Sequence, residues 1–208
     1  MNDKLHWENI YQTKTPAQVS WFQEHAVLSL QLIQGAQTEK TAHIIDVGGG
    51  TSPLVDDLLA DGFPNLTVLD ISRTALDAAQ RRLGPRAAGV TWLEADITRA
   101  DLPENAYDVW HDRAVFHFLT KPEDRGRYAE VARRSIKTGG HVIMATFSLD
   151  GPTECSGLDT MRYDPASLYR ELGNEFQFVE SLPETHHTPF GTVQKFIYCH
   201  FRRVSRAS

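Results

Sequence analysis

The segment Asp46-Val47-Gly48-Gly49-Gly50-Thr51-Ser52 is the first part of the sequence whose residue types indicate chemistry. Glycines let a backbone approach a ligand closely, and a helix that starts after them presents free N–H groups to an anionic part of that ligand. The glycine that a dinucleotide fingerprint needs three residues after Gly50 is replaced by Pro53. The Gly-Lys-Ser/Thr of a phosphate-binding loop is absent from the sequence. A dinucleotide is therefore disfavoured as the ligand, and a nucleoside triphosphate more so.

Two further aspartates stand where strands are expected to end. Asp70 closes an apolar run at 66–70, and Asp96 follows another at 90–94. A carboxylate at the end of the second strand can accept both hydroxyls of a ribose, and Asp96 can accept a hydrogen bond from the amine of adenine. Together with Asp46 they would repel a phosphorylated nucleotide, so they favour an adenosine that carries a positive charge, such as a sulfonium. The competing interpretation is that each aspartate caps a loop or helix.

The elements that must position these residues alternate between short apolar runs and amphipathic segments. Strands are expected over 42–47, 66–70, 90–94, 107–111, 141–147, 176–180 and 193–202. Helices are expected to begin after Ser52, Ser72 and Asp164 and to span 122–136, and 138–140 is expected to turn the chain. This alternation predicts a doubly wound α/β fold: a Rossmann-like, seven-stranded, mostly parallel sheet with an antiparallel edge strand and helices on both faces.

Composition narrows the function classes further. The chain has 208 residues, of which 27 are acidic and 21 basic, giving a net charge of −6. A nucleic-acid-binding protein needs clustered positive charge, and a bilayer span needs roughly 20 apolar residues in a row; the sequence has neither. Cys155 and Cys199 have neither a disulfide-framework nor a metal-ligand spacing. We expect a soluble, cytoplasmic single domain over 1–208, monomeric or homodimeric, with no metal, nucleic-acid or membrane partner.

The pattern Asp46-x-Gly48-x-Gly50, followed by Asp70, Asp96 and the segment 108–112, resembles the motif series of class I S-adenosylmethionine-dependent methyltransferases. The resemblance is strong over 41–147 and weaker in the flanks. Ser52 stands where the family often has a third glycine, and a small serine fits there. The segment with Trp7, Tyr11 and Trp21 is similar to the N-terminal cover of small bacterial methyltransferases and, more distantly, to the group containing thiopurine methyltransferase and the citrate-synthase lysine methyltransferase.

The resemblance implies S-adenosylmethionine as the methyl donor and S-adenosylhomocysteine as the product. It implies that the amino-acid end of the donor lies on 48–50, the ribose on Asp70 and the adenine beside Asp96 and Ile97. The residues expected to contact the donor are Asp46, Gly48, Gly49, Gly50, Ser52, Asp70, Ile71, Asp96, Ile97, Asp112 and Arg113. It further divides the chain into an N-terminal helical cover (1–40), a donor-binding core (41–147) and a substrate-side and edge-strand segment (148–208).

The resemblance implies that the end of the fourth strand lies beside the sulfonium and faces the methyl acceptor. It reads Asp112-Arg113-Ala114-Val115, not the Asn/Asp-Pro-Pro-Tyr/Phe of many amine methyltransferases, so methylation of DNA adenine or glutamine is disfavoured. His117, with Asp112, is the first candidate for catalysis as a general base; His187 and His186 are the second. Arg113 either binds an acidic group of substrate or donor or forms a structural salt bridge.

Four aromatic residues are predicted to enclose the sulfonium or the substrate, with core packing as the alternative: Trp7, Tyr11, Trp21 and Phe116. The substrate residues expected besides these are His117 and His187. A small-molecule partner with an O, S or N acceptor is the leading hypothesis. A protein-lysine methyltransferase and a non-catalytic donor-binding module are the alternatives, and a dinucleotide-dependent reductase is a more distant one. Cys155 is read as an inert loop cysteine in preference to a methyl-accepting thiol.

Overall fold

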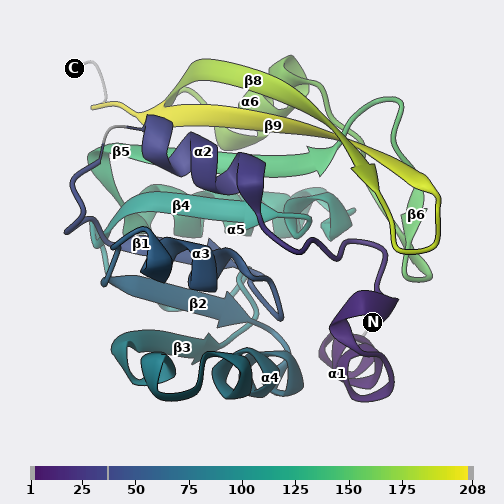
Figure 1. The fold of residues 1–208 in the computed structure, drawn as a ribbon. Helices are drawn as coiled ribbons and strands as arrows, with labels where there is room; N and C mark the ends of the chain where they lie inside the picture. Colours follow the sequence, from purple (N-terminus) through teal and green to yellow (C-terminus); the bar gives the residue numbers. More distant parts are fainter. Residues whose placement is uncertain (1–2, 37, 206–208) are drawn as a thin grey trace.

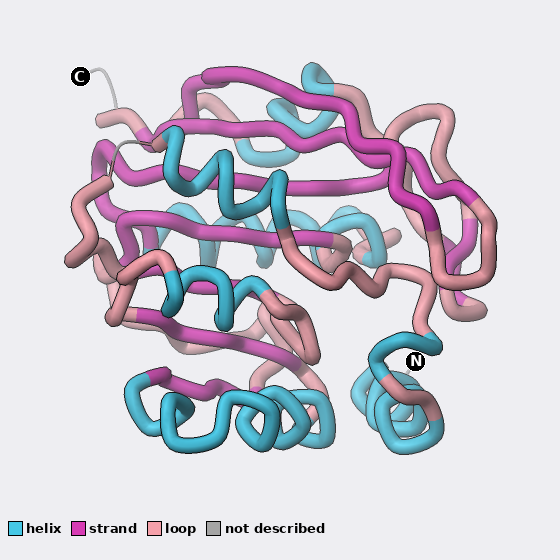
Figure 2. Tube along the Cα trace, viewed as in Figure 1, coloured by secondary structure: helices cyan, strands magenta, loops and turns pink. Residues whose placement is uncertain are grey.

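A computed structural model describes residues 3–36 and 38–205 (Figures 1 and 2). Residues 1–2, 37 and 206–208, which belong to the predicted segments 1–40 and 148–208, lie outside the described residues. One sheet holds β1 (Ile44–Val47), β2 (Leu66–Asp70), β3 (Val90–Glu94), β4 (Tyr107–Arg113), β5 (Ile136–Phe147), β8 (Phe176–His187) and β9 (Val193–Arg203), in the order β3-β2-β1-β4-β5-β9-β8.

The first five strands run parallel, and β9 lies antiparallel between β5 and β8. This confirms the predicted seven-stranded, mostly parallel sheet with antiparallel pairing at its edge. In β8 the register shifts between Phe178 and Glu180, which marks a β-bulge on the outermost strand. The strand order reverses between β1 and β4, so the crevice where doubly wound sheets bind ligands lies at the carboxyl ends of these two strands.

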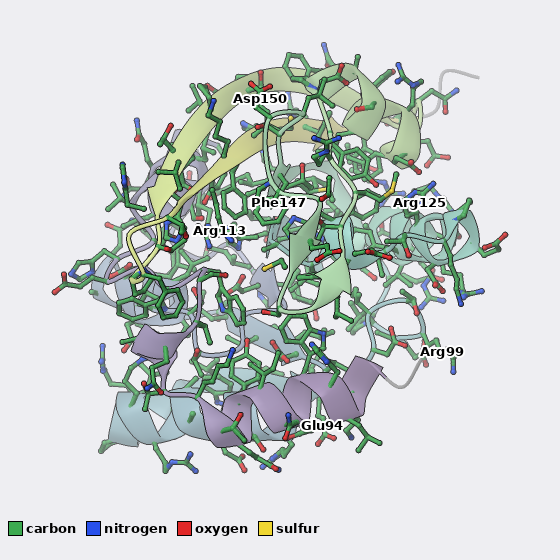
Figure 3. The ribbon with its side chains drawn as sticks, turned by 90° about the vertical axis from the view of Figure 1, so that its right-hand side faces the viewer. Glu94, Arg99, Arg113, Arg125, Phe147 and Asp150 are labelled. Carbon is green, nitrogen blue, oxygen red and sulfur yellow. The ribbon has the colours of Figure 1, made fainter. Side chains whose placement is uncertain are left out.

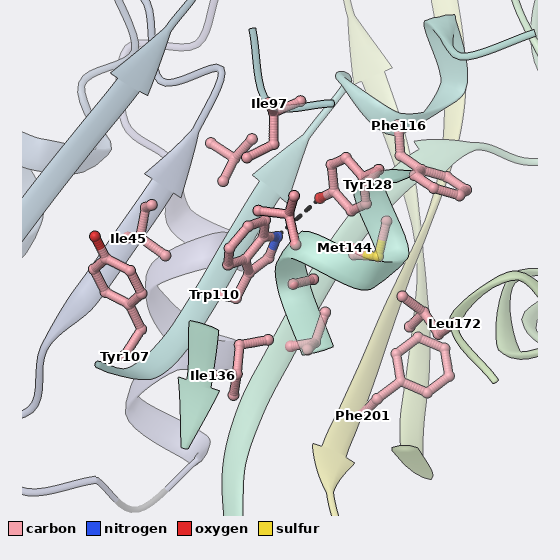
Figure 4. Close-up of a cluster of buried hydrophobic side chains, with 14 of the residues drawn as sticks. Ile45, Ile97, Tyr107, Trp110, Phe116, Tyr128, Ile136, Met144, Leu172 and Phe201 are labelled. Carbon is pink, nitrogen blue, oxygen red and sulfur yellow. Dashed lines mark hydrogen bonds between the residues drawn. The ribbon is translucent and has the colours of Figure 1, made fainter. Parts of the chain in front are cut away.

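Helices cover both faces of the sheet. α2 (Val27–Gly35), α3 (Leu54–Ala60) and α4 (Arg73–Leu83) pack on one face, and α5 (Pro122–Ser135) and α6 (Pro165–Leu172) on the other (Figure 1). Successive strand residues supply opposite cores, as Ile44 joins the α2–α3–α4 side and Ile45 the α5–α6 side. Figure 4 shows the second of these clusters, in which the indole of Trp110 contacts Tyr128.

Two element boundaries differ from the sequence prediction. α3 begins at Leu54 with Pro53 in the capping position, although the Ser52 hydroxyl still accepts a bond from the Leu54 N–H at 3.2 Å. β5 begins at Ile136, so 138–140 lies within its bounds. The pairing with β4 passes from Ile136 to His141 there, so the predicted turn is an irregularity within the strand. A Cβ on Gly140 would lie 3.0 Å from the carbonyl oxygen of Asp108, so glycine serves a close approach to β4 here. The Ser72 and Asp164 helix caps are confirmed.

The N-terminal segment divides between two positions. α1 (Asp3–Thr13) and the 3₁₀ helix η1 (Pro16–Gln18) lie at the carboxyl ends of the parallel strands, as the sequence predicts (Figure 1). α2 instead packs on the sheet face because Leu32 and Ile33 belong to the buried cluster there. The short elements that remain are η2 (Gly84–Gly89), η3 (Phe116–Phe118), β6 (Glu154–Cys155) and β7 (Leu158–Asp159). None of the described helices combines the length and the apolar character that crossing a membrane requires.

Candidate functional site

The glycine loop after β1 is folded back onto the end of β2. The N–H groups of Gly48 and Gly49 both donate to the carbonyl oxygen of Leu69, at 2.7 and 3.1 Å. Gly48 and Gly50 have positive φ angles of +66° and +46°, which favour glycine. A Cβ on Gly48 would overlap a neighbouring side chain, and one on Gly49 would lie 2.7 Å from Asp46 Oδ2. The backbone therefore reaches the Asp46 carboxylate as closely as it does only because these residues are glycines.

Arg82 of α4 holds the other end of this loop. Its guanidinium donates to the carbonyl oxygens of Thr51 and Ser52, each at 2.7 Å, and pairs with Asp56 of α3 at 2.7 Å. Ser52, predicted to contact the donor, is thus fixed by its backbone. The sequence gives no signal for Arg82, because its partners are backbone oxygens about thirty residues away.

Asp46, at the end of β1, has one bonded and one free carboxylate oxygen. Its side chain is 5% exposed, and Oδ1 accepts a hydrogen bond from His111 Nδ1 at 2.7 Å. Oδ2 is buried and has no hydrogen-bond partner among the described residues. Burying a carboxylate oxygen without a hydrogen-bond donor costs free energy. This atom therefore indicates that a ligand supplies the missing hydrogen-bond donor.

Asp70, at the end of β2, faces the same loop. It is 5% exposed, and its Oδ1 accepts a bond from the Ser72 N–H at 2.8 Å. Burial raises the pKa of Asp70 to about 7, neighbouring carboxylates add to the rise, and the N–H groups of Ser72 and Gly50 oppose it. A Cβ on Gly50 would lie 2.8 Å from the Tyr11 hydroxyl and 3.0 Å from Asp70 Oδ2. The structure therefore brings together the glycine loop, both aspartates and Tyr11.

α1 is held over this site by its charged side chains. The Glu8 carboxylate accepts bonds from the N–H groups of Arg73 and Thr74, at 2.6 and 3.3 Å, and so caps the first turn of α4. Lys4 pairs with Glu94 at the end of β3, and Figure 3 shows Glu94 beside α1. α1 is thus attached at the carboxyl ends of β2 and β3, the two strands beside which Asp70 and Asp96 lie.

Three of the four predicted aromatic residues form one cluster, and Phe118 takes the place of the fourth. The ring centroid of Trp7 lies 6.4 Å from that of Tyr11, 5.7 Å from Trp21 and 5.1 Å from Phe118. Phe116 is fully buried in the core on the α5 side, which contradicts its predicted contact with the substrate. The reason is the 3₁₀ turn at η3, which directs residues two apart to different sides.

Asp112 is turned away from the glycine loop. It is fully buried and accepts bonds from the Tyr128 hydroxyl at 2.6 Å and from the N–H groups of Val115 and Phe116 at 2.9 and 3.2 Å. Burial raises the pKa of Asp112 to about 6, and these hydrogen bonds oppose the rise. Strand alternation places Asp112 with Trp110 on the α5 face. Asp112 therefore fixes the turn after β4, and these bonds argue against its predicted roles in catalysis and donor binding.

Arg113 is committed to partners within the protein. Its Nε donates to the Tyr198 hydroxyl at 3.0 Å, its Nη1 to the Trp21 carbonyl at 3.2 Å and its Nη2 to Glu184 at 3.3 Å. The guanidinium also lies 4.6 Å from the ring centroid of Phe196. Of the two predicted interpretations, the geometry favours the structural salt bridge over the binding of donor or substrate.

His117 lies in the packed interior and not at the surface of the site. It is fully buried, its ring stacks on Phe147 at 4.3 Å, and its Nδ1 accepts a bond from the Phe147 N–H at 3.2 Å. Burial, followed by the charge of Arg113, lowers the pKa of His117 to about 3. Such an imidazole is neutral near pH 7 and is a weak base, which argues against the predicted roles of His117 in catalysis and substrate contact.

The predicted adenine-binding residues follow β3. Asp96 is half-buried, and its Oδ1 accepts bonds from the N–H and hydroxyl of Thr98, at 2.9 and 2.7 Å. Ile97 is buried in the α5-side core, and Ile71 is half-buried directly after Asp70. Asp96 thus caps a turn, and the contacts of these three residues with adenine stay a prediction.

A cavity of about 350 Å³ lies between the loop that precedes α2 and the β8–β9 hairpin. It is lined by Ala17, Phe22, Gln23, Glu24, His186, His187 and Pro189. His186 is buried, its Nε2 donates to the Ser20 carbonyl oxygen at 2.8 Å, and burial lowers its pKa. His187 is exposed at the rim, so it is the predicted histidine that a ligand in this cavity would meet.

The methyltransferase domain family matches residues 45–144. A mouse eEF1A lysine and N-terminal methyltransferase is 21% identical over 134 residues, which is 64% of this chain and 19% of the relative. The chain therefore spans about a fifth of the length of this curated relative.

Two solved structures share the fold of the chain at low sequence identity. One, from work on the conversion of a disulfide bond into a thioacetal group during echinomycin biosynthesis, has a TM-score of 0.80 and 16% identity and covers 100% of this chain and 95% of its own. The other is 1,6-didemethyltoxoflavin-N1-methyltransferase of Burkholderia thailandensis with bound 1,6-didemethyltoxoflavin and S-adenosylhomocysteine, with a TM-score of 0.69, 18% identity and coverage of 86% of this chain and 78% of its own.

Proposed function

Residues 45–144 form a class I S-adenosylmethionine-dependent methyltransferase domain, and from this premise we propose that the protein transfers a methyl group to an O, S or N atom of a small molecule. The donor and the acceptor in this reaction depend on different parts of the site, and each part is supported by its own observation.

The single observation that carries the donor assignment is the buried, unpartnered Oδ2 of Asp46 beside the glycine loop. S-adenosylmethionine carries an ammonium group, whose N–H groups can donate the hydrogen bond that this oxygen lacks. The carboxylate of Asp70 can accept the ribose hydroxyls. Because burial and mutual repulsion disfavour two adjacent carboxylates, a ligand with positive charge suits them. These residues therefore fit the donor.

When bound, S-adenosylmethionine supplies an electrophilic methyl group on its sulfonium. The task of the protein is to hold the acceptor in line with that carbon and to exclude water. The rings of Trp7, Tyr11 and Trp21 form one cluster, and the Tyr11 hydroxyl lies beside Gly50. Aromatic faces favour a neighbouring cation. Where the acceptor must lose a proton, we assign its removal to His187 at the cavity rim.

The covered strand ends and the size of the open cavity at the β8–β9 hairpin favour a small acceptor. α1 covers the carboxyl ends of the strands, and the nearby cavity of about 350 Å³ lies within the range of roughly 300–1,000 Å³ typical of small-ligand sites. Its lining combines the apolar ring of Phe22 with polar groups from Gln23 and two histidines. That mixture suits a compact molecule with a few polar atoms.

Protein lysine is the second candidate acceptor. The similarity to the mouse eEF1A lysine and N-terminal methyltransferase favours it, and the net charge of −6 would help attract a basic protein. The Burkholderia structure, which holds a small molecule, favours the first candidate.

Incubation with isotopically labelled S-adenosylmethionine distinguishes these acceptors. The protein is supplied with a metabolite panel in one arm and with cell lysate in the other, and Asp70→Asn serves as the donor-site control against Asp77→Asn on the exposed face of α4. Label in a metabolite, lost in Asp70→Asn alone, supports the proposal; label confined to a protein band refutes the small-molecule acceptor. Calorimetric binding of NADH, without binding of S-adenosylmethionine or S-adenosylhomocysteine, would refute the donor.

A further inference from the structure

A chain of buried polar side chains crosses the sheet from the glycine loop to β9. Asp46 Oδ1 lies 2.7 Å from His111 Nδ1, and His111 Nε2 lies 2.8 Å from the Ser29 hydroxyl on α2. Ser29 lies 3.3 Å from the Tyr198 hydroxyl, which lies 3.0 Å from Arg113 Nε. Ser29, His111 and Tyr198 are each at most 2% exposed, so solvent does not supply alternative partners.

The hydrogen bonds between these buried side chains have one consistent direction. A carboxylate only accepts, so Nδ1 of His111 carries a proton and donates it to Asp46. At the other end a guanidinium only donates, so the Tyr198 oxygen accepts from Arg113. The Tyr198 hydroxyl then donates to Ser29, and Ser29 donates to His111 Nε2. Every polar atom in the sequence of bonds is satisfied, and the ring of His111 is held from both sides.

The order Ser29–His111–Asp46 is that of a hydrolase triad, but it cannot act as one. Ser29 has no exposed surface, and Tyr198 covers its oxygen. An acyl group would have no path to this hydroxyl. These hydrogen-bonded residues therefore have another role, which concerns the carboxylate of Asp46.

We propose that His111 is a positioning residue for the methyl donor, acting through Asp46. By occupying Oδ1, the imidazole fixes the carboxylate plane so that Oδ2 stays free beside Gly49, where it receives the ammonium of the donor. Ser29 sets the ring orientation by bonding to the opposite nitrogen. This inference depends on the proposed donor, and it assigns His111 and Ser29 to the amino-acid end of that donor alone.

Two substitutions of His111 separate its two bonds. The amide nitrogen of asparagine reaches the position of Nδ1 and keeps a donor for Asp46, whereas that of glutamine reaches the position of Nε2 and leaves Asp46 unbonded. Calorimetry with S-adenosylhomocysteine measures binding of the whole product. Calorimetry with 5′-methylthioadenosine, which has no amino-acid end, measures binding of the adenosine part. His200→Gln is the matched control, since His200 is also buried and bonded, at 2.8 Å to His141, away from the glycine loop.

We expect His111→Gln to weaken S-adenosylhomocysteine binding by about 10- to 100-fold, as for one hydrogen bond to a charged group. His111→Asn should change it by about threefold or less, and 5′-methylthioadenosine should bind all variants alike. Equal binding of S-adenosylhomocysteine by His111→Gln and the unaltered protein would overturn the inference, as would an equal loss for both ligands. If His111→Gln does not fold, as judged by thermal melting, Ser29→Ala takes its place and should weaken the same ligand selectively; no selective loss overturns the inference. Failure of the unaltered protein to bind either ligand would refute the proposed function itself.

Discussion

Replacing Asp70 by asparagine should remove a loss of stability that the free protein undergoes as the pH rises, and should weaken its binding of the methyl donor. Burial keeps the carboxyl group of Asp70 protonated up to a pKa of about 7, compared with an ordinary value of 3.8. Between these values the unfolded chain is ionised at this residue while the folded protein still holds the proton. Since the folded state then binds more protons, its stability falls as the pH rises through this window.

The size of the effect follows from the shift. A rise from 3.8 to about 7 corresponds to about 4 kcal/mol of folding free energy, lost between roughly pH 4 and pH 8. An asparagine does not ionise, so the stability of Asp70→Asn lacks this decline. The amide group faces the N–H of Gly50 where the carboxylate accepted, which adds a constant offset at every pH. The ionisation of Asp70 is therefore measured by how the difference in unfolding free energy between the two proteins changes with pH. The absolute value of that difference does not measure it.

Urea unfolding at intervals from pH 5 to pH 8 measures that dependence on pH. Asp112, whose pKa is also raised, is present in both proteins and cancels in the difference. Asp164→Asn is the control, because bonds from Ser167 lower the pKa of Asp164 and its difference curve should be flat over this range. A curve for Asp70→Asn that is flat within about 1 kcal/mol would refute the account of its burial. Unchanged affinity for S-adenosylhomocysteine would refute its assignment to the ribose.

Three further outcomes are expected. Gly48→Ala should unfold at lower urea than Gly84→Ala: both residues have positive φ, +66° and +59°, but only at Gly48 would the new Cβ meet another side chain. Tyr128→Phe should lose about 2–4 kcal/mol of stability in urea unfolding, since its hydroxyl bonds both Trp110 and a buried carboxylate. Tyr163→Phe removes a buried hydroxyl that has no hydrogen-bond partner among residues 3–36 and 38–205, so it should lose none, and equal losses in the two would contradict this. Binding of S-adenosylhomocysteine near pH 7 should release a proton from Asp70, because its carboxyl group, with a pKa of about 7, must ionise to accept the ribose hydroxyls. The release is measured as a dependence of the calorimetric heat on the ionisation enthalpy of the buffer.

The fold was predictable because local signals agree with the tertiary arrangement. The Ser72 and Asp164 caps begin the helices where the sequence indicates, and β1 is buried on both faces as its apolar residues predict. The length of β5 was not predictable, because Gly139 and Gly140 are typical of turns, and Gly140 serves here to let one strand pass close to another. That function depends on β4, which is distant in sequence.

The site was predictable on β1 and β2 and not on β4. Asp70 is the last residue of β2 and Asp46 the last but one of β1, so both lie at carboxyl ends beside the glycine loop, as the carboxyl-end rule requires. After β4 the chain makes a turn at Ala114, which has a φ of +73°, a conformation that alanine rarely adopts and that no sequence pattern announces. This turn, fixed by Asp112, carries His117 into the core. The alternation of β4 alone would have shown that Asp112 faces away from His111.

The bulged outer strand β8 has a consequence for the protein in concentrated solution. An unpaired sheet edge is a template on which strands of other molecules can add. In β8 the bulge between Phe178 and Glu180 twists that edge, Pro183 has no N–H to offer, and the side chain of Glu180, 47% exposed, adds charge. These features end the sheet at its seventh strand and protect the folded chain against edge-to-edge aggregation.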